Sequence, residues 1–183
     1  MCGRNPEMTT LTDRLIAPNA THGEVTTAFA AAFAGAATAF ALSLHADLAV
    51  WRAAIVALVA FDMFGGAVVN ATDSAKRWYH RPGRTTAHHL GFVAIHLQPF
   101  ILAAVVPGFT WPSAVVIYAL ALIGAVAVTI SPDALRRPIA FGVTAFAIVG
   151  VASMLTVPHA LAWFAPVLLI KLLLAHLLPE KAR

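Results

Sequence analysis

Cysteine and charge are both scarce in this sequence. Cys2 is the only cysteine among 183 residues, so the chain can form no internal disulfide and no metal site built on a pair of thiolates. Its place in the N-terminal tail also disfavours it as a catalytic nucleophile. Only 11% of the residues are Asp, Glu, Lys or Arg, whereas soluble domains carry about 25%. This shortage of charge excludes an ordinary water-soluble domain.

Apolar sequence takes the place of charge. Hydrophobic residues make up 60% of the chain, and its mean hydropathy is +0.82. This composition predicts an all-α, polytopic membrane protein whose main partner is the lipid bilayer. The formal net charge of +4 comes mostly from Lys and Arg in the connections and tails. Such residues commonly set membrane orientation, so the positive charge gives no reason to predict a nucleic-acid partner.

Six apolar runs predict a single-domain bundle of six transmembrane helices. Each run is long enough to cross about 30 Å of hydrocarbon at about 1.5 Å per residue. Turn residues such as Pro82-Gly83 and Pro107-Gly108 separate the runs. The predicted domain, residues 24–179, lies between tails at residues 1–23 and 180–183, and its spans cover residues 25–44, 48–70, 88–106, 113–130, 138–156 and 160–178.

The distribution of Lys and Arg predicts the orientation of the bundle. With six spans, both tails and the second and fourth connections lie on one side of the membrane. That side holds Arg4, Arg14, Lys76, Arg77, Arg81, Arg84, Arg136, Arg137, Lys181 and Arg183, and the other side holds Arg52. Because positive residues collect on the cytosolic side, we expect both termini to be cytosolic. The expected location is a plasma membrane of the bacterial inner-membrane type.

Three ionisable residues lie at a similar depth in three of the predicted spans. Asp62, His96 and Lys171 are each about eight residues, or about 12 Å, from the same end of their spans. Burying one charge in hydrocarbon costs at least about 2.5–3.5 kcal/mol, so such residues face one another or a polar cavity. We therefore expect the second, third and sixth spans to surround a cavity open to the cytosol, with these residues as its candidate catalytic groups.

A shallower layer of polar side chains is predicted at the mouth of this cavity. Asn70, His89 and His176 lie nearer the same end of the three spans. His89 and His96 are seven residues apart and would share one face of a continuous helix. The connection after the second span is rich in polar and aromatic residues. The candidate substrate-binding residues are Asn70, Asp73, Trp78, Tyr79 and His80.

Metal and haem binding are the cofactor hypotheses that the His residues raise. Imidazole with carboxylate suits zinc or iron, and the candidate ligands of a divalent metal are Asp62, His89, His96 and His176. No HExxH motif is present. Along one helix, His89 and His96 would be about 10 Å apart, so other spans would have to complete a metal site. The inward His residues are too few for two bis-His haems, which disfavours haem.

Several uses of such a cavity stay open at this level. The leading interpretation is a small membrane enzyme, or a protein that binds a metal or another ligand, because the Asp, Asn, Trp, Tyr and His residues exceed what a simple ion path needs. One alternative is a small proton-coupled transporter or channel, which at this size would act as a homo-oligomer. Another is a structural or accessory membrane subunit. In a purely structural reading, Asp62 and Lys171 only neutralise each other.

Overall fold

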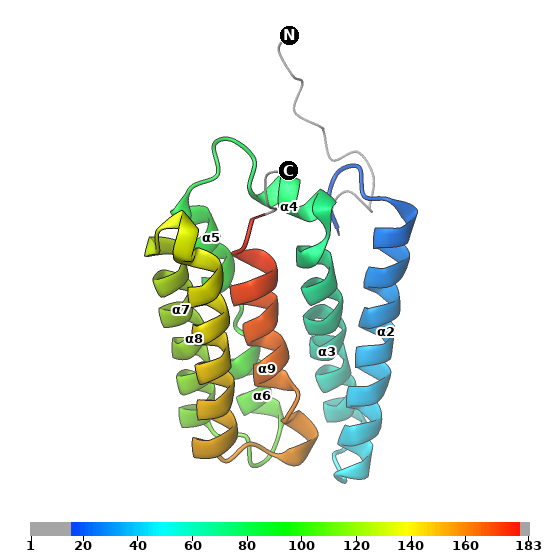
Figure 1. The fold of residues 1–183 in the computed structure, drawn as a ribbon. Coiled ribbons are helices and arrows are strands. Elements are labelled where there is room, and N and C mark those ends of the chain that lie inside the picture. Colours follow the sequence, from blue (N-terminus) through cyan, green and yellow to red (C-terminus); the bar gives the residue numbers. More distant parts are fainter. Residues whose placement is uncertain (1–15, 180–183) are drawn as a thin grey trace.

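Six helical segments run side by side as an antiparallel bundle in the computed structural model of the chain, which describes residues 16–179 (Figure 1). All six are long and apolar enough to cross a membrane. Within the described range the chain forms no β-strand. The predicted all-α class and the six spans are therefore confirmed.

The helices follow the predicted spans, but the third and sixth spans are divided. The elements are α2 (His22–His45), α3 (Val50–Ala71), α4 (Asp73–Tyr79), α5 (Thr86–Ala94), α6 (Gln98–Val105), α7 (Trp111–Ile130), α8 (Asp133–Met154), the 3-10 turn η1 (His159–Leu161), α9 (Phe164–Leu169) and the π-helix η2 (Ile170–His176). The fifth span starts at Asp133, five residues before the predicted start, and Pro138 lies inside it. The polar connection predicted after the second span contains the helix α4.

Small residues bring α2 and α3 close together. The buried face of α2 consists of Ala28, Ala32, Gly35, Ala39 and Ser43. The ring of Phe64 on α3 packs directly over Gly35, where any added side chain would collide with it. Membrane helices lack a strong hydrophobic drive toward one another, so close packing of this kind stabilises the pair.

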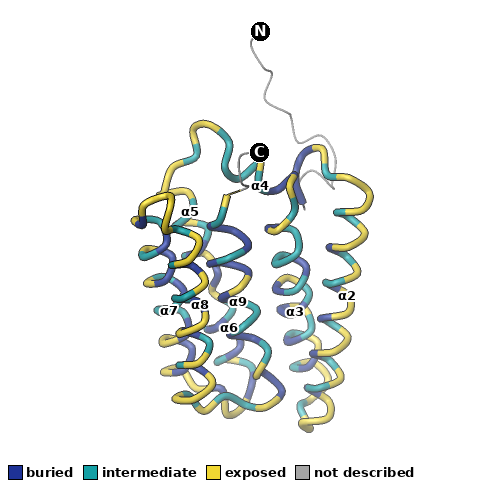
Figure 2. The backbone as a smooth tube through the Cα atoms, in the orientation of Figure 1, coloured by how far each residue is buried: buried dark blue, intermediate teal, exposed yellow. Residues whose placement is uncertain are grey.

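Large apolar side chains point outward from the bundle. Phe33, Leu58 and Phe146 are among the most exposed of them. Figure 2 shows exposed residues along the outer faces of the helices and buried residues on the faces that meet. Such a surface suits contact with lipid chains.

The third span is not one continuous helix, in contrast to the prediction. α5 ends at Ala94 and α6 begins at Gln98, so residues 95–97 interrupt the span. Pro99 lies in the first turn of α6, where its missing N–H costs nothing. In a continuous helix the same proline would leave a carbonyl one turn earlier without a donor. The proline therefore fixes where the second half of the span can start.

The sixth span also departs from a regular α-helix. It continues from α9 into η2, whose seven residues have the wider π-helical turn and include Lys171 and His176. π-helical segments are rare and are frequent at functional sites. The angle of about 100° between successive residues of an α-helix does not apply to this π-helical segment. The directions of its side chains could therefore not be predicted from the sequence.

The helix α4 crosses one end of the bundle, where the described chain also begins and ends (Figure 1). We call this the α4 end; the charge distribution predicts that it is cytosolic. Glu24 of α2 accepts a hydrogen bond from Ser74 N at 3.1 Å. Lys76 donates to the carbonyls of Ala175 and Leu178, at the C-terminal end of the sixth span. These contacts tie α4 to both α2 and the sixth span.

Candidate functional site

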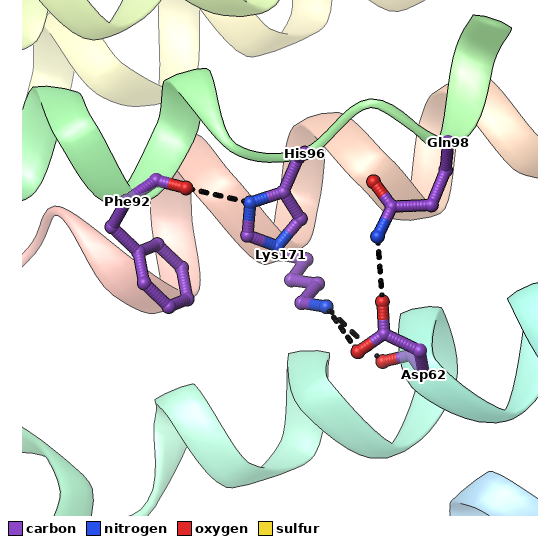
Figure 3. Close-up of polar contacts among 5 residues, drawn as sticks. All are labelled: Asp62, Phe92, His96, Gln98 and Lys171. Carbon is purple, nitrogen blue, oxygen red and sulfur yellow. Dashed lines mark hydrogen bonds and ion pairs between the residues drawn. The ribbon is translucent and has the colours of Figure 1, made fainter.

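Asp62 and Lys171 form an ion pair in the interior of the bundle. Lys171 Nζ lies 2.9 Å from Asp62 Oδ1 and also donates to the Asp62 carbonyl at 3.2 Å (Figure 3). Only 3% of the Lys171 side chain is exposed, whereas 49% of the Asp62 side chain is exposed. Gly66 makes room for the lysine, because a Cβ there would lie 2.5 Å from Lys171 Cε. The buried cation is thus neutralised by a carboxylate that is itself half open.

The interruption of the third span supplies further polar groups to this ion pair. Gln98, the first residue of α6, donates through Nε2 to Asp62 Oδ2 at 3.0 Å. Its Oε1 atom is buried and has no hydrogen-bond partner. His96 lies in the interruption itself, is buried, and feels the charges of both Lys171 and Asp62. We call Asp62, His96, Gln98 and Lys171 the ion-pair site.

Two side chains satisfy carbonyls that the interruption leaves free. His96 Nδ1 lies 2.7 Å from the carbonyl of Phe92, four residues earlier (Figure 3). Tyr118 on α7 donates its hydroxyl proton to the carbonyl of Ala94 at 2.7 Å. A carbonyl acceptor requires the proton of His96 on Nδ1, which leaves Nε2 as a free acceptor when the ring is neutral. The broken segment is therefore held in place at membrane depth, as such backbone must be.

A cavity of about 250 Å³ lies beside the ion pair and extends toward the α4 end. Asp62 and Lys171 line it together with Asn70 and Tyr79. The remaining lining residues are apolar or glycine: Ile16, Ala28, Phe29, Ala32, Phe61, Gly65, Gly66 and Val69. The amide Nδ2 of Asn70 is buried without a hydrogen-bond partner. The cavity thus combines apolar walls with a carboxylate at one position and an unused N–H donor at another.

The predicted mouth layer is only partly brought together. His89 Nδ1 lies 3.2 Å from His176 Nε2, and His80 Nε2 lies 2.9 Å from the backbone carbonyl of His176. The rings of His80 and His89 stack at 4.6 Å between centroids. We call these three residues the His cluster. Asn70, predicted to share this layer, lines the cavity instead.

The other predicted substrate-binding residues have separate environments. Tyr79 lines the cavity, and burial raises the pKa of its phenol against the opposing charges of Arg84 and Arg81, so it is a neutral hydroxyl. The guanidinium of Arg81 lies over the ring of Trp78, 3.5 Å from the ring centroid. Asp73 is exposed in the first turn of α4 and does not line the cavity.

The four predicted metal ligands are not assembled into one site. Asp62 binds Lys171 and Gln98, His96 binds a backbone carbonyl, and His89 pairs with His176. Within residues 16–179, no group of three or more His, Cys, Asp and Glu side chains is arranged to hold a metal ion. His89 lies in α5 and His96 in the interruption that follows it, so the two do not share one helix.

Sequence reasoning missed two residues of the ion-pair region. Neither Gln98 nor Tyr118 is a strong acid, base or metal ligand, so a pattern of ionisable residues does not include them. A signal for Gln98 was present, since a polar amide between His96 and Pro99 is unusual in an apolar run. Tyr118 carried no such signal, because its partner carbonyl is free only when the third span is interrupted.

Comparison with known proteins adds no relative from which to transfer a role. No family model matches the chain, and neither a curated protein nor a solved structure is significantly similar to it. The function must therefore be argued from the geometry.

Proposed function

We propose that this membrane protein binds a small amphipathic molecule in the cavity beside Asp62 and Lys171. The observation that carries the proposal is the asymmetry of the ion pair. A lysine that is 97% buried is paired with a carboxylate that opens onto the cavity. In hydrocarbon, the lone pairs that a half-open carboxylate leaves unused would cost free energy unless another polar group met them.

The chemistry of the lining indicates a neutral head group. Asp62 and Lys171 already neutralise each other, so a further full charge at this depth would be uncompensated. The half-open carboxylate still has unused lone pairs that accept a hydrogen bond. A hydroxyl or an amide N–H satisfies both conditions. The apolar walls around Phe29, Phe61 and Val69 then suit an aliphatic or aromatic body.

Octanol and its analogues of equal chain length provide the first test. The protein is reconstituted into nanodiscs of a zwitterionic lipid, and octanol, octyl methyl ether, octylamine and octanoate are titrated while tryptophan fluorescence is recorded. Saturable binding should be strongest for octanol. The ether, which lacks the donor, and the two charged analogues should bind about tenfold more weakly, the equivalent of one hydrogen bond to a charged group.

The matched pair of variants is Asp62→Asn and Asp73→Asn. Both remove one carboxylate, but only Asp62 lines the cavity. Asp62→Asn should abolish the preference for octanol over the ether, and Asp73→Asn should retain it. Equal loss in both variants, or no saturable binding in the wild type, would refute the proposal.

Proton-coupled transport is the second candidate, and the two divided spans favour it. Discontinuous helices at the bilayer midplane are a feature of many transporters. Here the interruption at residues 95–97 and η2 both bring side chains to Asp62. Protein in liposomes with an inward proton gradient and an internal pH dye decides this question. Proton entry that depends on both Asp62 and Lys171 would favour transport over binding alone.

A further inference from the structure

A second polar pocket lies at the α4 end of the bundle. Its volume is about 70 Å³, and its lining residues are His80, Thr86, His89, Thr129, Arg136 and Leu177. None of these residues lines the cavity beside Asp62. The pocket is therefore a separate site, reached from the predicted membrane surface.

Hydrogen-bond donors without a fixed acceptor gather in this pocket. The Nε atom of Arg136 is buried and has no hydrogen-bond partner within the described part of the chain. Its Nη2 atom lies 2.8 Å from Asp133 Oδ1, but 89% of that carboxylate side chain is exposed. Exposed ion pairs are weak, so an anion in the pocket can compete with Asp133 for the guanidinium. Among residues 16–179, no carboxylate lines the pocket.

The hydrogen bonds of the His cluster leave a second donor on His89, which lines the pocket. His176 Nδ1 is buried and has no partner, so this nitrogen is more favourably a lone pair than an N–H. The proton of His176 then lies on Nε2 and is donated to His89 Nδ1. Neutral His89 must carry its own proton on Nε2. Thr86, also in the lining, adds a hydroxyl.

The electrostatic surroundings are positive as well. Burial lowers the pKa of His80, and the positive charges of Lys76 and Arg136 act in the same direction, against the hydrogen bond to the His176 carbonyl. A bound anion would relieve this repulsion. The pocket therefore has hydrogen-bond donors and nearby positive charge, and no described residue of its lining supplies a negative charge to meet them.

We propose that this pocket binds a phosphate group, supplied by an anionic phospholipid or by free phosphate. A tetrahedral phosphate has the several acceptor oxygens needed to meet Arg136, His89 and Thr86 at once. Basic pockets between spans at the cytosolic face commonly hold lipid head groups. Arg136 also borders a wider groove of about 470 Å³ with Arg137 and Leu178, which gives room for the rest of a lipid.

Imidazole NMR signals of the protein labelled with nitrogen-15 histidine test this proposal. The His89 signal is identified by its loss in His89→Gln, and the protein is held in nanodiscs of phosphatidylcholine. One arm adds inorganic phosphate, and the other replaces part of the lipid with phosphatidic acid. We expect saturable shifts of the His80 and His89 signals in at least one arm. A response to phosphatidic acid alone identifies the lipid, and a response to inorganic phosphate identifies the free ion.

Arg136→Gln and Arg77→Gln form the matched variants. Both remove one positive charge at the α4 end, but only Arg136 lines the pocket, and Arg77 lines neither the pocket nor the wider groove. Arg136→Gln should raise the half-saturating concentration about tenfold, and Arg77→Gln should change it by less than about twofold. If Arg136→Gln does not fold, Thr86→Val replaces it. Absence of shifts in both arms, or equal effects of the two arginine variants, overturns the proposal.

Discussion

The ion-pair site and the His cluster both include residues of the third and sixth spans, yet they hold polar groups in different ways. In the ion-pair site, opposite charges meet in the interior and side chains satisfy the carbonyls of a broken helix. In the His cluster, imidazole rings stack and share protons, and positive groups surround them. We expect the first arrangement to depend on each partner and the second to tolerate substitution. Four predictions test this difference.

Removing the carboxylate of Asp62 should have the largest effect. Asp62→Asn leaves Lys171 buried without a counter-charge, which costs about 3 kcal/mol or more of stability. The midpoint of thermal unfolding in one detergent measures the loss. Adding Lys171→Met to Asp62→Asn should recover most of it, because the uncompensated charge is then gone. A double variant no more stable than the single one would show that the pair does not carry this energy.

A methyl group at Gly66 should have the next largest effect. The added Cβ would lie 2.7 Å from Lys171 Nζ, so the end of the lysine side chain must leave its present position against Asp62. We expect Gly66→Ala to cost about 1–3 kcal/mol. Gly142→Ala is the control, because nothing lies within 4 Å of its added Cβ. The control should be neutral or stabilising by up to about 1 kcal/mol, as for other helical glycines. Equal stabilities of the two variants would contradict the packing described here.

Substitution within the His cluster should be milder. His176→Phe loses the hydrogen bond to His89 but keeps the ring that stacks on Phe92 at 3.9 Å, and it removes the unpartnered Nδ1 atom. The net cost should be less than about 1.5 kcal/mol. The same thermal measurement applies. A loss as large as that of Asp62→Asn would remove the distinction between the two regions.

The pH dependence of the His cluster should give the smallest effect. Burial lowers the pKa of His80 below its usual value of 6.5. Below pH 6.5 the unfolded chain therefore binds more protons at this residue than the folded protein does, so its contribution to stability falls as the pH falls. When the pH is lowered from about 7 to about 5, the unfolding midpoint of the wild type should fall relative to that of His80→Gln. A difference that does not depend on pH would show that His80 titrates normally.

The number of spans and the meeting of Asp62 with Lys171 could be predicted because both depend on length and depth. A charge in an apolar run needs a partner at its own level, and depth follows from counting residues. The directions of side chains were less predictable, since inferring them from the sequence assumes continuous α-helices. The interruption at residues 95–97 and the π-helix η2 break that assumption. The contacts of Gln98 with Asp62 and of Tyr118 with the Ala94 carbonyl depend on the interruption, so the sequence alone did not predict them.

The infrared difference spectrum of Asp62 tests the central claim most directly. The wild type and Asp62→Asn are compared in zwitterionic nanodiscs at neutral pH, with and without octanol. We predict that Asp62 gives the band of an ionised carboxylate, which is shifted by octanol but not by octyl methyl ether. A carbonyl band of a protonated acid would contradict the ion pair. An ionised band that neither octanol nor octyl methyl ether shifts would contradict the binding site and leave Asp62 and Lys171 as a structural pair.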